Sequence, residues 1–227
     1  MSATLEVMDR AIHIEPPEPT SEDRDQVVVL RNASWALYQA VLDARGEAPR
    51  PRIAYLDGEL EIMTTSRRHE IGKTMLARLL EAWAEERHVS LNGIGNATFQ
   101  KEADQAGLEP DECYCIGAMT EFPGLAIEIV HTSGVIDKLE IYRRLGVGEV
   151  WFWIERKIWV YRLIAGIYQH RTKSTALRGI DLDKLARLVT STDDSQQTEA
   201  VRAYRRSQRR PATPVGRAAG RSKRRRS

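Results

Sequence analysis

Hydrophobic residues recur at helical spacing in several stretches of the chain. The predicted helices cover residues 34–45, 67–88, 134–145 and 182–188. The longest has Ile71, Met75, Leu79 and Trp83 at intervals of four, which places them in one apolar stripe. Thr65 or Ser66 can cap its start, because a side-chain oxygen there accepts from a free backbone N–H. Each stretch is therefore expected to pack one face against a core.

Shorter apolar runs bounded by turn residues predict strands. These runs cover residues 52–56, 59–63, 97–100, 110–116, 124–130, 150–154, 158–162 and 166–169. Asp57-Gly58 is a favoured two-residue turn, so 52–63 is interpreted as a β-hairpin. The run 150–162 is interpreted as a second one. Residues 124–130 are apolar on both faces except at Glu128, which predicts a strand in the centre of its sheet.

Length and charge divide the chain into three parts. The 227 residues suit one domain with extensions: a polar N-terminal extension over 1–28, a folded domain over 29–190, and a basic, disordered tail over 191–227. The net charge of +2 conceals an asymmetry, since residues 200–227 hold 11 Lys/Arg and no Asp/Glu. The remainder carries 23 Lys/Arg against 32 Asp/Glu, a net charge of −9. We expect the tail alone to add phosphate affinity, in a salt-dependent way.

Composition also limits the setting. No run approaches the roughly 20 apolar residues that span a bilayer, so no membrane segment is expected. The N-terminus has no apolar stretch typical of a secretory signal. Cys113 and Cys115 are too close along one strand for a disulfide framework, which favours a reducing, cytoplasmic setting. A zinc site would need two further soft ligands, so both cysteines are interpreted as core residues.

Glu128 and Asp111 are the candidate site carboxylates. Burying an ionised carboxylate in the apolar run around Glu128 requires a cation, hydrogen-bond donors or a pKa shift. The alternative is a structural ion pair with Arg143 or Arg144. Asp111 follows Pro110 and opens a strand, which can also be a simple turn. Two carboxylates on neighbouring strands can hold a hard divalent cation.

Three further residues extend the candidate site. Lys138 opens the helix downstream and could steady the water that attacks a phosphate, although it could equally be a surface lysine. His69 and Glu70 begin the long helix and could line a cleft. A solvent-facing histidine and an ordinary first-turn acid are the alternatives. Trp151 and Trp153 share one strand face, where core packing is more common than base stacking.

Several motifs in order resemble the Uma2 family, also called DUF820, of restriction-endonuclease-like proteins. They are Tyr55-Leu-Asp-Gly-Glu-Leu, Ser66-Arg-Arg-His, Glu109-Pro-Asp, Ala126-Ile-Glu-Ile-Val, Lys138-Leu-Glu-Ile-Tyr-Arg-Arg-Leu-Gly-Val and Glu149-Val-Trp-Phe-Trp. Together they span roughly residues 30–170. The resemblance implies an α/β (α+β) restriction-endonuclease-like fold of the PD-(D/E)XK type, with a mixed central sheet flanked by helices and added β-hairpins.

The resemblance also implies a chemistry. Asp111 and Glu128 would bind Mg²⁺, or alternatively Mn²⁺, in an endonuclease that hydrolyses DNA. The strand position that usually carries the lysine is Val130, and the family supplies that lysine from the next helix, at Lys138. An Asp common one turn earlier is Gly134 here. DNA is the expected partner, and cutting two strands is compatible with a homodimer. The alternative is a catalytically silent module that binds nucleic acid or a protein partner.

Overall fold

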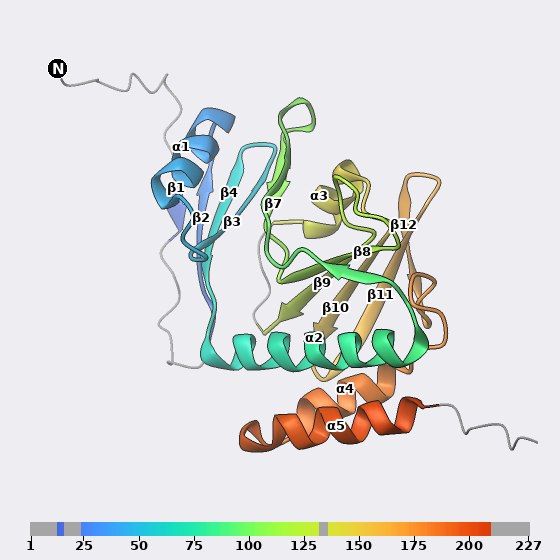
Figure 1. Ribbon diagram of the computed structural model, residues 1–227. Coiled ribbons are helices and arrows are strands. Elements are labelled where there is room, and N and C mark those ends of the chain that lie inside the picture. Colours follow the sequence, from blue (N-terminus) through green and yellow to red (C-terminus); the bar gives the residue numbers. More distant parts are fainter. Residues whose placement is uncertain (1–12, 16–23, 132–135, 210–227) are drawn as a thin grey trace, which may run out of the picture.

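Strands in the described part of the chain form two six-stranded sheets (Figure 1). The computed structural model describes residues 13–15, 24–131 and 136–209. The first sheet has the order β1-β2-β4-β3-β7-β6, and its described pairs are antiparallel. Its strands are β1 (His13–Glu15), β2 (Gln26–Arg31), β3 (Arg52–Leu56), β4 (Glu59–Thr64), β6 (Phe99–Lys101) and β7 (Ala106–Leu108).

The second sheet is mixed and has the order β12-β11-β10-β9-β8-β5. Its strands are β5 (Leu91–Gly93), β8 (Glu112–Ile116), β9 (Leu125–Val130), β10 (Glu149–Ile154), β11 (Lys157–Ile164) and β12 (Ile167–Arg171). Strands β9 and β10 run parallel, and the other described pairs are antiparallel. The central place expected for residues 124–130 is confirmed, because β9 lies between β8 and β10.

Five α-helices in the described residues surround the sheets. They are α1 (Trp35–Arg45), α2 (Arg67–Arg87), α3 (Lys138–Leu145), α4 (Leu182–Ser191) and α5 (Gln197–Gln208), with short 3₁₀ turns η1 (Glu102–Asp104) and η2 (Asp194–Gln196). Ser34 and Ser66 cap α1 and α2, since each Oγ accepts a backbone N–H three residues on. Asp137 caps α3, which therefore begins later than residue 134.

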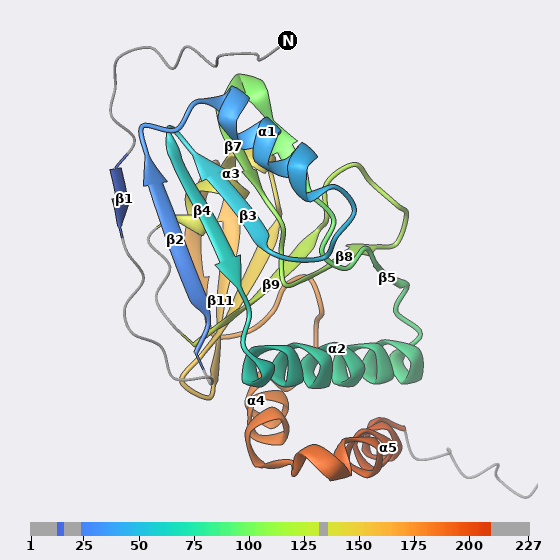
Figure 2. The ribbon, with the colours of Figure 1, turned by 90° about the vertical axis from the view of Figure 1, so that its left-hand side faces the viewer.

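Three apolar clusters hold the layers together. The first joins α2, α4 and α5 to one face of the second sheet, and the second lies between the other face of that sheet, α3 and the first sheet. The third packs α1 on the first sheet. In Figure 1, α2 runs beneath the second sheet with α4 and α5 below it, and Figure 2 shows α1 on the outer side of the first sheet.

The fold class predicted from the sequence is confirmed: a mixed sheet is flanked by helices, and both predicted hairpins are present. The turn at Asp57-Gly58 uses positive φ at both residues, of 47° and 95°. The sequence did not reveal that the first hairpin belongs to a sheet of its own, the first sheet, separate from the mixed sheet that contains β9. Strand β2 was missed as well, because it falls in the stretch next to the polar extension.

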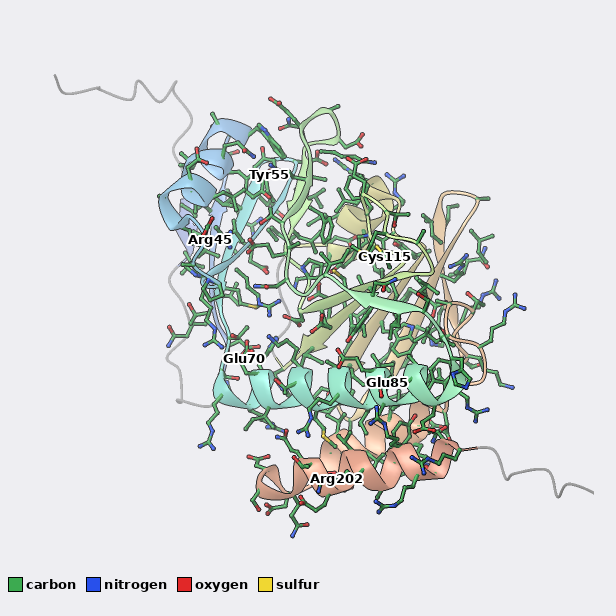
Figure 3. The ribbon with its side chains drawn as sticks, in the orientation of Figure 1. Arg45, Tyr55, Glu70, Glu85, Cys115 and Arg202 are labelled. Carbon is green, nitrogen blue, oxygen red and sulfur yellow. The ribbon has the colours of Figure 1, made fainter. Side chains whose placement is uncertain are left out.

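The disorder predicted for residues 191–227 is wrong for part of that segment. Residues 197–208 form α5, whose Tyr204 is only 2% exposed within the first cluster. Arg205 pairs with Glu85 at the far end of α2, and Figure 3 shows Arg202 on α5 as well. The basic composition hid the helix, because arginine is a good helix former and one buried tyrosine anchors it. Residues 210–227, and most of 1–28, lie outside the described residues.

Among the described residues, no helix combines the length and the apolar character needed to cross a bilayer.

Candidate functional site

Glu128 is completely buried and meets two side chains from α3. Lys138 Nζ donates a hydrogen bond to Glu128 Oε2 over 2.7 Å, and the Tyr142 hydroxyl donates to Oε1. Lys138 and Tyr142 are four residues apart, so they lie on the same side of the helix. Asp137 and the left-handed Gly146 fix the two ends of this short helix. The α3 helix therefore supplies both partners of the buried carboxylate.

Asp111 lies beside Glu128 at the same level of the sheet. Glu112 pairs with Ile127 across β8 and β9, so the preceding residue comes opposite Glu128. The Ile129 N–H donates to Asp111 Oδ2 over 2.6 Å. Arg52, at the start of β3, brings Nη1 to 2.6 Å from Asp111 Oδ1 and donates to the carbonyl of Pro110. Long-range pairing thus unites the two candidate carboxylates.

His69 connects Asp111 to a second aspartate. Its Nε2 lies 2.9 Å from Asp111 Oδ1, and its Nδ1 lies 2.9 Å from Asp25 Oδ2. The Ser66 N–H donates to the other oxygen of Asp25 over 2.7 Å. Burial alone would lower the pKa of His69, but the two carboxylates outweigh burial and raise that pKa to about 9. His69 is therefore an imidazolium at neutral pH.

The same charges act on the carboxylates and on Lys138. Burial works against ionisation of Asp111, yet His69, Arg52 and Lys138 hold its pKa below the usual range. Burial raises the pKa of Glu128, and the neighbouring Asp111 adds to this. Burial would lower the pKa of Lys138, but Glu128, Asp111 and Glu61 together raise it. Lys138 is thus a fixed cation among carboxylates, and it is unsuited to act as a base.

A cavity of about 290 Å³ opens beside this cluster, between the two sheets. Its charged side contains Lys138, Glu61 and Asp25. Its apolar and aromatic walls come from β2, β4, β10, β11 and the carboxyl end of β9. Asp111 and Glu128 lie behind Lys138, and both are at most 1% exposed. The lysine is thus the site residue that reaches both the buried carboxylates and the cavity.

The donor set of this centre fits a hard divalent cation. Magnesium is commonly held by one or two carboxylates, with water and phosphate oxygens completing its shell. Asp111 Oδ1 is buried without a well-aligned hydrogen bond in the described part of the chain, although Arg52 and His69 lie close. No cage of three or more His, Cys, Asp or Glu side chains occurs in the described ranges. Asp111 and Glu128 are the residues that would hold such an ion.

Other sequence interpretations change with the structure. Arg143 and Arg144 do not pair with Glu128; both contact Glu140, and Arg144 also contacts Asp57. The solvent-facing alternative for His69 is wrong, because the ring is fully buried.

The cleft-lining role of His69 and Glu70 stays a prediction. Glu70, labelled at the first turn of α2 in Figure 3, is held by Thr65, Arg50 and Lys73, and the described cavity wall contains neither residue. His69 is fully buried and contacts Asp25 and Asp111. Gly134, which stands where the resemblance leads us to expect an Asp, lies outside the described residues.

Sequence reasoning missed Arg52, Asp25, Glu61 and Tyr142. Of these, only Tyr142 could have been found from the sequence, because it lies four residues after Lys138 and so on the same side of the helix. Core packing of Trp151 and Trp153 is confirmed, since both belong to the cluster under α2. Cys113 and Cys115 are free and buried.

The fold and the site define a mixed α/β protein with a buried acidic centre beside a cavity. The chain belongs to the Uma2 family, whose description is "Putative restriction endonuclease" and whose sequence model matches residues 35–208. Among solved structures, it is similar to a putative nuclease belonging to DUF820 from Anabaena variabilis. That similarity has a TM-score of 0.42 and 11% identity, and covers 70% of this chain and 96% of the other. We transfer no residue or role at that level. No curated protein matches the chain.

Proposed function

We propose that this protein is a metal-dependent endonuclease that hydrolyses DNA phosphodiester bonds, with Asp111, Glu128 and Lys138 as its centre. The observation that carries the proposal is the position of Lys138. Its ammonium group donates to a buried carboxylate over 2.7 Å, and the same residue lines a cavity large enough for part of a substrate. Membership of the Uma2 family supports the same reaction class.

Each residue has a defined task in this proposal. Mg²⁺ or Mn²⁺, held by Asp111 and Glu128, would lower the pKa of a bound water and offset the charge of the scissile phosphate. Lys138 orients the attacking water and stabilises the negative charge that develops on the phosphate, since its raised pKa keeps it protonated. Tyr142 holds the second oxygen of Glu128. Arg52 and His69 keep Asp111 ionised.

The basic residues after α5 would add affinity for the DNA backbone without reading sequence. A homodimer would suit the cutting of both strands.

A second candidate is a silent module that binds nucleic acid without cutting it. One observation favours it: both oxygens of Glu128 are engaged by Lys138 and Tyr142, and Asp111 is already flanked by Arg52 and His69. The protein's own cations thus compensate the two carboxylates. Such a module would bind DNA equally well with and without magnesium.

Nicking of supercoiled plasmid in Mg²⁺, Mn²⁺ or EDTA tests both candidates. Glu128→Gln is the informative variant, because the amide keeps the size of the side chain and an acceptor for Tyr142. Glu59→Gln, on the first hairpin, is a matched carboxylate control away from the centre. We expect metal-dependent nicking by the wild type and by Glu59→Gln, and its loss in Glu128→Gln. That variant should keep the wild-type circular dichroism spectrum but melt at a lower temperature, because Lys138 loses a buried charge partner. Undiminished nicking by Glu128→Gln would reject this centre. Gel retardation without cutting in either metal would favour the silent module.

A further inference from the structure

A row of aromatic side chains extends from the cavity across the second sheet. Val150 pairs with Tyr161, Phe152 with Trp159, and Tyr161 with His170. Directly paired residues point to the same face, so these rings lie together on the face opposite α2. The Phe152 and Tyr161 ring centroids are 5.8 Å apart, those of Tyr161 and His170 are 5.8 Å apart, and those of Trp159 and His170 are 5.3 Å apart.

These rings are not core residues in the way that Trp151 and Trp153 are. Phe152, Tyr161 and Trp159 are half-buried, and His170 is exposed. Phe152 and Tyr161 also line the cavity that Lys138 enters. The aromatic row (Phe152, Tyr161, His170 and Trp159) therefore begins beside the proposed catalytic lysine and runs outward over β11 and β12.

A cation accompanies the rings. Lys157 Nζ lies 4.2 Å from the centroid of the Trp159 ring. Partly exposed rings next to cations are the combination that binds single-stranded nucleic acid, in which bases stack on rings and cations meet phosphates. The three carboxylates that line the cavity are each engaged within the protein. Asp25 is held by His69 and Ser66, Asp137 accepts from the Glu140 N–H, and Glu61 accepts from the Ile136 N–H.

We propose that the aromatic row binds unpaired bases of the DNA strand whose phosphate lies at Lys138, so that the substrate is single-stranded or locally unpaired DNA. The proposal rests on the proposed function for the identity of the ligand. Stacking requires an open base face, which a regular duplex does not offer. A cavity of about 290 Å³ is at the lower end of ligand pockets, roughly 300–1,000 Å³, and so suits one base rather than a duplex.

The test is binding of a short fluorescein-labelled oligothymidylate, measured by anisotropy in EDTA so that no cleavage is needed. Tyr161→Leu removes the central ring but keeps an apolar strand residue, and Tyr161→Phe restores the ring. Ile167→Ala is the control, since Ile167 is an exposed apolar residue of the same β11–β12 hairpin. We expect Tyr161→Leu to bind about 5- to 150-fold more weakly. Tyr161→Phe and Ile167→Ala should bind like the wild type.

A second measurement uses Trp159 itself. Oligothymidylate should quench tryptophan emission in the wild type, and this quenching should be much smaller in Trp159→Phe, while affinity is kept. Wild-type affinity in Tyr161→Leu, or equal affinity for a duplex of the same length, would overturn the inference even if plasmid is cut. Binding that depends on Tyr161 in a protein that cuts no plasmid would keep the inference and reject the proposed nuclease.

Discussion

Raising the pH should remove stability that His69 provides. This ring is fully buried between Asp25 and Asp111, and each nitrogen lies 2.9 Å from a carboxylate oxygen. The imidazolium compensates both charges, whereas a neutral ring leaves two buried carboxylates with less compensation. Deprotonation therefore weakens the connection between the start of α2 and the site.

The sign and size follow from the pKa. The pKa of His69 rises from 6.5 to about 9 on folding, because the two carboxylates outweigh the effect of burial. At pH values between 6.5 and about 9, His69 therefore keeps its proton in the folded protein and has lost it in the unfolded chain. The contribution is complete below pH 6.5 and disappears as the pH passes about 9. The difference corresponds to about 3 kcal/mol of unfolding free energy.

Urea unfolding followed by circular dichroism, at intervals between pH 6.5 and 9, measures this loss. His69→Gln is the matched variant, because it cannot titrate and retains an amide. We expect the wild type to lose stability across the window and the variant to start lower and stay flat. Burial raises the pKa of Cys113 to about 12, so that thiol weakens the fold only at higher pH. A flat wild-type profile, or equal slopes in both proteins, would refute the assigned role of His69.

Three further predictions concern stability. Asp111→Ala should lower the unfolding free energy by about 3–5 kcal/mol, because it leaves buried cations unpaired. Asp111→Asn should lower it less, because its side-chain oxygen still accepts the Ile129 N–H. Equal losses of both variants in urea titrations would contradict this. Gly107→Ala should cost roughly 1–3 kcal/mol, since its Cβ would lie 2.4 Å from the Tyr38 hydroxyl, and Tyr38→Phe should recover part of the melting temperature. Deleting residues 197–227 should lower the melting temperature by uncovering the cluster around Tyr204, whereas deleting 210–227 alone should not.

Local patterns contained much of the architecture. The apolar stripe of α2, the Asp57-Gly58 turn and the helix caps all follow from nearest neighbours along the chain, and each is found in the structure. The anomaly at Glu128 was equally local, since one carboxylate in an apolar strand demands a partner. Periodicity could also place Lys138 and Tyr142 on one side of a helix.

The partners of the site were decided by tertiary structure. Three cationic residues near Glu128 in sequence were candidates, and only the packing of α3 selects Lys138 and turns Arg144 towards Asp57. Arg52 reaches Asp111 from a strand about sixty residues earlier, a separation that no local pattern encodes.

The sequence by itself determined the long helix α2, the two hairpins, the central strand β9 and which carboxylate could not stay unpaired, because backbone propensity and side-chain period act over a few residues. Only the tertiary structure decided that two sheets enclose the cavity, that His69 bridges two aspartates, and that α5 completes the core. These depend on contacts between distant segments, whose geometry is fixed by the simultaneous packing of all layers.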